Sequence, residues 1–296
     1  MSEPSYRVGV ILVLIAGLLW SMMGLFIRLI ETAGTWQILL YRSLGLVPVL
    51  FTVIALRAGR APFGRIRRAG WTGVAGGVAL VLAFSGAIFA IQSTSVANAV
   101  FLFAASPLLT AVLAWPLLRE PVRGATWIAI MIAGVGMFLM VREGLALGAG
   151  WGNGAALVSA LGFAIFTITL RRGRNGDMLP AVVIGGVLSI LTAVGVLTLN
   201  GEPIEVPVRD MAIAGLMGAL ILGGGMAAYT AGSRAVPAAE LTLLSMVEVM
   251  LAPVWVFVFL AEKTSFNTLV GGAVLLAAIL FNAFSGMRHR PPPPLA

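Results

Sequence analysis

The amino-acid sequence predicts an all-α membrane protein, in which ten transmembrane helices form two inverted five-helix repeats. Two observations point to a membrane. The 296-residue chain is 60% hydrophobic and only 10% charged, whereas a soluble domain carries about 25% charged residues. Its mean hydropathy is +1.04, which excludes a disordered chain or a small disulfide-stapled fold. The third observation, the repeat, comes from the order of the apolar runs.

Ten apolar runs are long enough to cross a bilayer, because about 20 helical residues span roughly 30 Å of hydrocarbon. The segments between the runs are too short to hold a further domain. The predicted spans are 8–30, 35–56, 70–91, 96–118 and 123–141 in the first half, and 151–170, 178–199, 210–232, 240–260 and 267–286 in the second. The runs are broken by charged residues, glycine and proline.

The basic residues predict the orientation of these spans. With the N-terminus inside, fourteen of the nineteen Lys and Arg residues fall in cytoplasmic segments. The opposite side holds Arg28, Arg142, Arg209 and Lys263, and Arg42 lies within a span. Because cytoplasmic loops are enriched in Lys and Arg, both termini are predicted to be cytoplasmic. The same distribution accounts for the net charge of +8 without a nucleic-acid partner.

The two halves of the chain can be superposed in sequence. At an offset of 142 residues, Gly73 and Gly76 fall on Gly215 and Gly218, and Glu120 falls on Glu262. Each of these glutamates closes a long apolar helix ahead of the last span of its half. Since five spans is an odd number, the second copy must enter the membrane from the opposite side. We therefore predict one repeat at residues 1–149, an inverted repeat at 150–286, and a disordered cytoplasmic tail at 287–296.

This pattern resembles the drug/metabolite transporter superfamily, and within it the EamA branch of ten-helix bacterial exporters. The residues that carry the resemblance are Arg42 early in the second span, Ser106-Pro107 with Leu118-Arg119-Glu120, and Val247-Glu248 with Leu260-Ala261-Glu262. In overall sequence the chain is similar to aromatic amino-acid exporters of the YddG type. The resemblance implies that helices 1–4 and 6–9 surround a central cavity, with helices 5 and 10 peripheral.

Two ionisable side chains lie well inside predicted spans, where their insertion costs about 2.5–3.5 kcal/mol each. Glu248, near the middle of its span, could meet a substrate ammonium group or carry a coupling proton; the alternative is a structural acceptor for a neighbouring helix. Arg42, roughly 10 Å deep, could hold a substrate carboxylate through two hydrogen bonds. The alternative for Arg42 is a permanent salt bridge, or an extended side chain that reaches the outer interface.

Several neutral residues are further candidates for the substrate site. Small polar residues between membrane helices usually serve packing, and deep aromatic residues usually face lipid or core. Trp20 and Phe163 hold equivalent places in spans 1 and 6, so they could face each other and stack on a flat substrate. The remaining candidates are Tyr41, Asn98, Ser106 and Tyr229.

Two mid-span prolines, Pro107 and Pro253, are candidate hinges beside the cavity. The notable departure from the family pattern is Val249, where the family often places proline after the glutamate of helix nine. Any kink in this helix is therefore expected about one turn later, at Pro253.

The motifs that the sequence lacks narrow the function further. It has no Gly-x-x-x-x-Gly-Lys-Ser/Thr loop, and it has no cysteine, so neither an ATP-driven pump nor a thiolate metal site is predicted. No metal or cofactor is expected. The predicted function is a secondary active or facilitative transporter that exports small amphipathic metabolites, chiefly hydrophobic or aromatic amino acids, by alternating access. The alternatives are a channel-like pore and, less favoured, a membrane enzyme; the protein is expected to be a monomer or homodimer.

Overall fold

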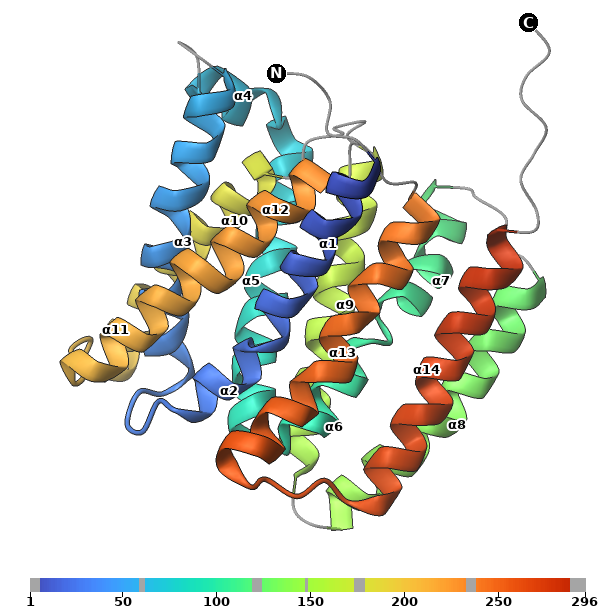
Figure 1. Ribbon diagram of the computed structural model, residues 1–296. Coiled ribbons are helices and arrows are strands. Elements are labelled where there is room, and N and C mark those ends of the chain that lie inside the picture. Colours follow the sequence, from blue (N-terminus) through green and yellow to red (C-terminus); the bar gives the residue numbers. More distant parts are fainter. Residues whose placement is uncertain are drawn as a thin grey trace, which may run out of the picture.

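The computed structural model describes residues 6–58, 62–118, 124–146, 149–172, 179–232 and 238–287. Every regular element in these residues is a helix (Figure 1). The helices of the first half are α1 Tyr6–Ser21, α2 Met23–Arg28, α3 Thr35–Ala58, α4 Pro62–Arg68, α5 Gly70–Ser93, α6 Val96–Phe103, α7 Ser106–Leu118 and α8 Gly124–Ala146. Those of the second are α9 Gly150–Arg172, α10 Leu179–Asn200, α11 Val208–Leu216, the π-helix η1 Met217–Gly224, α12 Gly225–Gly232, α13 Ala238–Leu260 and α14 Phe266–Met287.

The predicted fold class is confirmed. Among the residues that the structure describes, seven helical segments are long and apolar enough to cross a membrane, and three shorter helices, within α8, α13 and α14, are also apolar. The long segments are Tyr6–Arg28, Thr35–Leu56, Gly70–Ser93, Val96–Leu117, Gly150–Thr169, Leu179–Asn200 and Val208–Gly232. Each of the ten predicted spans therefore corresponds to one helix or to a chain of shorter helices. The predicted tail, apart from Met287, lies outside the described residues.

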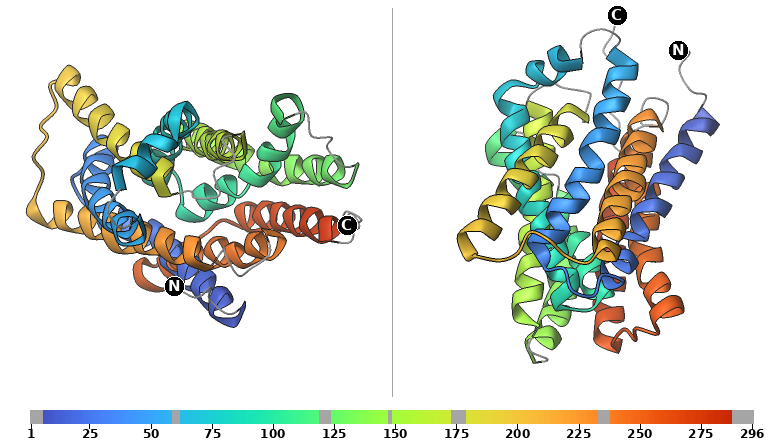
Figure 2. Two further views of the ribbon diagram at one scale, coloured as in Figure 1. Left: turned by 90° about the horizontal axis from the view of Figure 1, so that it is seen from above. Right: turned by 90° about the vertical axis from the view of Figure 1, so that its left-hand side faces the viewer.

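The helices of the two halves pack in matching pairs. In the first span of each half, α1 packs against α12 and α13, while α9 packs against α5 and α7. The second spans α3 and α10 contact each other, and so do the last spans α8 and α14. Figure 2 shows the α8–α14 pair at one edge of the bundle, as the resemblance implied. This pair is tied by a 2.7 Å hydrogen bond from Thr126 Oγ1 to Asn282 Oδ1.

The bundle has two ends, which we name by the short helices that they hold. The start of α1 and the end of α14 lie with α4 at the upper end in Figure 1, called the α4 end. The opposite α2 end holds α2, the segment 201–207 before α11, and the start of α6. The short helix α4 lies in the basic segment that the sequence assigned to a loop.

Within the described residues three spans are interrupted, and the sequence predicted only one of these interruptions. The fourth span breaks between α6 and α7 at Ala104 and Ala105, next to Pro107, whose nitrogen cannot donate to the carbonyl one turn earlier. By contrast, α13 runs unbroken through Pro253. The first span breaks at Met22, and the eighth contains the π-helix η1. Neither break contains a proline, which is why the sequence did not reveal them.

Glycine contacts bring helix backbones together across the halves. A β-carbon on Gly218 of η1 would overlap the carbonyl oxygen of Arg42, and one on Gly45 would overlap the carbonyl of Gly215. The second and eighth spans therefore touch through their backbones, a packing mode typical of membrane helices. A π-helix often marks a functional site, and this one lies directly against the turn that carries Arg42.

Candidate functional site

Arg42 is the most distinctive polar group in the interior. It lies two turns into α3, and only 1% of its surface is exposed. Its guanidinium carbon lies 4.4 Å from the ring centroid of Phe84 on α5, a favourable cation–π distance. Nη1 makes a long 3.9 Å contact with the sulfur of Met23 on α2, while Nε and Nη2 have no hydrogen-bond partner.

Neither structural alternative for Arg42 is seen in the described residues. No carboxylate of those residues lies within ion-pairing distance of the guanidinium, and its burial rules out a head group that reaches solvent in this conformation. A buried cation is costly unless it is paired and fully hydrogen-bonded. The free N–H groups are therefore suited to an anion that arrives from outside the protein.

Trp20 and Tyr229 form an aromatic pair between the first and eighth spans. Their ring centroids are 5.4 Å apart, with the planes inclined at 40°. The indole nitrogen of Trp20 is buried without a partner, and its ring lies over Gly225, where a β-carbon would overlap it. Both side chains are half-buried. They offer an apolar face with one spare donor.

Phe163 makes a different contact from the one that the sequence suggested. Its ring lies 5.8 Å from that of Phe166, on the same helix α9, and 41% of its surface is exposed. The ring contact found for Trp20 is with Tyr229. A stack of Trp20 and Phe163 on a flat substrate stays a prediction.

Glu248 is half-buried near the middle of α13. Within the described part of the chain, its carboxylate makes no hydrogen bond or ion pair, and it does not pair with Arg42. Tyr41 points elsewhere: its hydroxyl donates to the carbonyl of Ile204 at 3.1 Å. Tyr41 thus ties α3 to the segment before α11, at the α2 end.

The two polar candidates of the fourth span are both buried. The side-chain nitrogen Nδ2 of Asn98 donates to the side-chain oxygen of Asn153 on α9 and to the hydroxyl of Thr94. Asn98 therefore bonds one helix to another, which is the ordinary packing role of such residues. Its own oxygen and the nitrogen of Asn153 are left without partners. Ser106 opens α7, directly after the break in the span.

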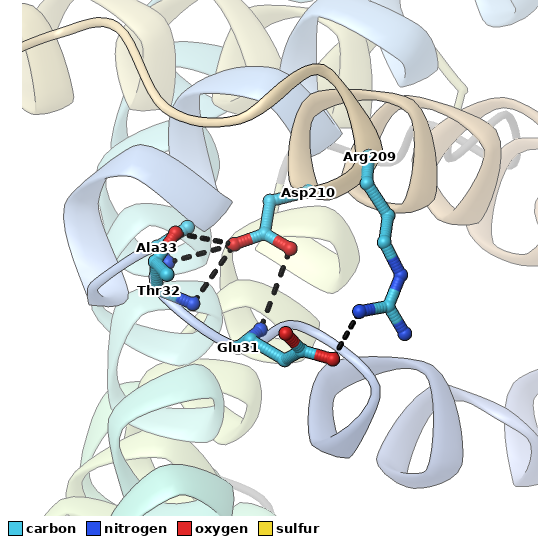
Figure 3. A network of polar contacts seen from close by, with 5 residues as sticks. All are labelled: Glu31, Thr32, Ala33, Arg209 and Asp210. Carbon is cyan, nitrogen blue, oxygen red and sulfur yellow. Dashed lines mark hydrogen bonds and ion pairs between the residues drawn. The ribbon is translucent and has the colours of Figure 1, made fainter.

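Asp210 anchors a turn at the α2 end, as Figure 3 shows. This residue begins the predicted span 210–232, and it lies in the first turn of α11 with 2% of its surface exposed. One carboxylate oxygen accepts from the backbone nitrogen of Thr32 at 2.9 Å, from its hydroxyl at 2.8 Å, and from the nitrogen of Ala33 at 3.0 Å. The other accepts from Glu31 at 3.4 Å. Beside it, the exposed side chains of Arg209 and Glu31 form an ion pair.

A further contact between the two halves joins Arg28 to Glu262. The Arg28 Nε atom lies 3.0 Å from Glu262 Oε2, and about a quarter of each side chain is exposed. Arg28 Nη2 donates to the carbonyl of Thr94 at 2.5 Å, and Glu262 Oε1 accepts from the nitrogen of Val96 at 2.8 Å. These two residues join four parts of the chain at the α2 end: α2, the end of α5, the start of α6 and the end of α13.

The sequence contained signals for part of this network. Glu262 stood out as a helix-closing glutamate, but its partner Arg28 was counted only as one basic residue on the outer side. Asp210 has no local pattern, because its partners are backbone groups almost 180 residues away along the chain. Glu120, the counterpart of Glu262 in the repeat, lies outside the described residues.

Two matching halves of apolar helices form an architecture that many repeat-built membrane transporters share. The EamA-like transporter family matches residues 7–142 and, a second time, residues 150–284. The chain therefore belongs to the EamA-like transporter family, in the drug/metabolite transporter superfamily. It is a transporter of small molecules and not an enzyme.

The comparison with solved structures supports the fold. One solved structure, described only as the crystal structure of a protein, has a TM-score of 0.64 with this chain at 17% sequence identity. The alignment covers 96% of this chain and 100% of the chain in that structure. At this level of identity the likeness concerns the fold alone. No curated protein is significantly similar to the chain in sequence.

Proposed function

We propose that the protein is an exporter of the bacterial inner membrane that moves small amphipathic metabolites, chiefly hydrophobic or aromatic amino acids, by alternating access. Family membership establishes a membrane transporter of small molecules; the substrate class, the direction and the mechanism are our proposal. The excess of basic residues in alternate loops supports cytoplasmic termini. In that orientation the α4 end faces the cytoplasm and the α2 end faces outward.

The observation that carries the proposal is the unpaired guanidinium of Arg42. A carboxylate matches the planar fork of an arginine and binds it through two charge-assisted hydrogen bonds. Nε and Nη2 are both free in the described structure, and together they present one such edge. An amino acid that carries its carboxylate to this edge removes the cost of a buried, unpaired cation.

The other candidates supply the remaining recognition in this proposal. Glu248 has no partner in the described residues, so we assign it to the substrate ammonium group or to a coupling proton. The pair of Trp20 and Tyr229 offers an aromatic face for an apolar side chain. The resemblance to YddG-type exporters also favours aromatic amino acids.

Other assignments rest on position alone. In this proposal Phe163, Asn98, Ser106 and Tyr41 contribute to the lining of the central cavity. The two hinges are Pro107, beside the observed break, and Pro253, within a continuous helix.

The test is flux of labelled aromatic amino acids into proteoliposomes, comparing Arg42→Met with the parent. Methionine keeps an unbranched side chain and removes the charge. If Arg42 had a purely structural role, this substitution would destabilise the protein. Our proposal predicts the reverse: the thermal stability is kept or raised, because an unpaired buried charge is removed, while saturable transport falls at least tenfold. The matched control is Arg142→Gln, an exposed arginine on α8, which should transport within twofold of the parent.

The same assay distinguishes the alternatives. Unchanged transport in a folded Arg42→Met protein would exclude Arg42 as the anchor. Ohmic current without saturation would point to a channel-like pore. For Glu248→Gln, full pH-gradient-driven transport would exclude a coupling proton on Glu248 and favour facilitated diffusion or exchange.

A further inference from the structure

The α-helical conformation stops on both sides of the short helix α2. It is separated from α1 by the single residue Met22, and it ends at Arg28, before the turn that Asp210 anchors to α11. Ser21, the last residue of α1, accepts a 2.8 Å hydrogen bond from the indole nitrogen of Trp255 on α13. The helix therefore lies between two fixed points, one on each side.

The first residue of α2 contacts the guanidinium group that carries the candidate anion site. The sulfur of Met23 contacts Nη1 of Arg42, and the guanidinium carbon lies over the ring of Phe84. Of these two neighbours, Phe84 belongs to the long, continuous helix α5, whereas Met23 belongs to a six-residue helix. If one wall moves to admit a ligand, α2 is the wall with the fewer attachments.

The last residue of α2 binds this helix to its neighbours. Arg28 bonds both Glu262 and the carbonyl of Thr94, and Glu262 also bonds the nitrogen of Val96. A β-carbon on Gly24 of α2 would overlap the side chain of Val96, so glycine lets the helix lie directly on the start of α6. This latch, formed by Arg28 and Glu262, is partly exposed to solvent. Water can therefore replace its bonds when it opens, which a fully buried pair would not permit.

The backbone before Glu262 is adapted to this contact. Ala261 adopts φ of 53°, a left-handed conformation that residues with a β-carbon rarely adopt. The turn that ends another helix, α10, has glycine in this conformation: Gly201, with φ of 67°. Non-glycine residues in this conformation are concentrated at functional sites. Here the turn ends α13 and places the carboxylate of Glu262 across the boundary between the halves.

We propose that α2 is the gate at the α2 end: the Arg28–Glu262 latch keeps the sulfur of Met23 against Nη1 of Arg42, and release of the latch exposes the anion site to that side of the membrane. The role of Arg42 as anion site rests on the proposed function. The existence of the gate does not, since it follows from the contacts of α2. Asp210 has the opposite role in this scheme, as the fixed anchor of the turn beyond the gate.

The test uses the absence of native cysteine. A single reporter, Met23→Cys, is introduced into the full chain in proteoliposomes, and its reaction with a membrane-impermeant maleimide is measured from the α2 side without substrate. Glu262→Gln in this background should raise the labelling rate at least tenfold. The matched control is Arg209→Gln, which removes a charge from the exposed ion pair at the same end; its labelling rate should stay within twofold of the reporter protein.

Arg28→Gln provides a second release of the latch and should act in the same direction. It replaces Glu262→Gln if that variant is not monodisperse in detergent. A labelling rate within twofold of the reporter protein in the folded latch variant would overturn the gate, and so would an equal rise in Arg209→Gln. If labelling rises as expected but Arg42→Met transports normally, the gate stands and the anion site is wrong.

Discussion

The Asp210 anchor gives a prediction whose magnitude can be worked from the contacts. In Asp210→Asn, the amide oxygen can still take the place of the carboxylate oxygen that accepts three bonds, from Thr32 twice and from Ala33. Each bond then changes from charge-assisted, worth about 1.5–3 kcal/mol, to neutral, worth about 0.5–1.5 kcal/mol. Because the three share one acceptor, we expect a total loss of about 2–3 kcal/mol in the free energy of opening the 31–33 turn.

Hydrogen exchange measures this opening directly. At 1.4 kcal/mol per factor of ten, the amides of Thr32 and Ala33 should exchange roughly 30- to 150-fold faster in Asp210→Asn than in the parent. The neighbouring control is Arg209→Gln. Its ion pair with Glu31 is exposed, so exchange at the same amides should change less than twofold. Unchanged exchange in Asp210→Asn would refute the anchor, and an equal effect in Arg209→Gln would assign it to net charge instead of these bonds.

Two further predictions concern stability, measured as thermal unfolding in one detergent. Gly218→Ala should lower the free energy of unfolding by about 2–3 kcal/mol, because the added β-carbon meets the backbone carbonyl of Arg42. In the control Gly154→Ala, the added β-carbon has no atom beyond its own stretch of helix within 4 Å, so this variant should be neutral or stabilise the protein by up to about 1 kcal/mol. Equal melting temperatures of the two variants would contradict the close contact at Gly218. Trp255→Phe should cost about 1 kcal/mol through the lost bond to Ser21. A melting temperature equal to that of the parent would show that this bond contributes nothing.

The fold was predictable from sequence because the bilayer imposes it locally. A helix must satisfy its own backbone in hydrocarbon, so each apolar run near 20 residues becomes a span without knowledge of its neighbours. An odd number of spans in each half then dictates inversion. Pro107 marked one break correctly, since loss of a backbone donor is also a local effect. The breaks at Met22 and in η1 were not predictable, because no proline marks them.

The candidate site divides in the same way. A rare charge inside an apolar run is visible in sequence, and this singled out Arg42 and Glu248 before any contact was known. Whether Arg42 has a partner depends on which residues of α2 and α5 reach it, and only the tertiary structure decides that. Sequence also could not pair Arg28 with Glu262, 234 residues away along the chain.

The sequence by itself therefore determined the membrane class, the number of spans, the repeat and the few charges worth testing. All of these depend on composition and local spacing. The tertiary structure decided which charges meet: a guanidinium left without a carboxylate partner in the described interior, and two carboxylates, of Asp210 and Glu262, that join segments of the two halves at the α2 end. The reason is physical, because hydrogen bonds and ion pairs act over about 3 Å in space, and distance along the chain carries no information about such contacts.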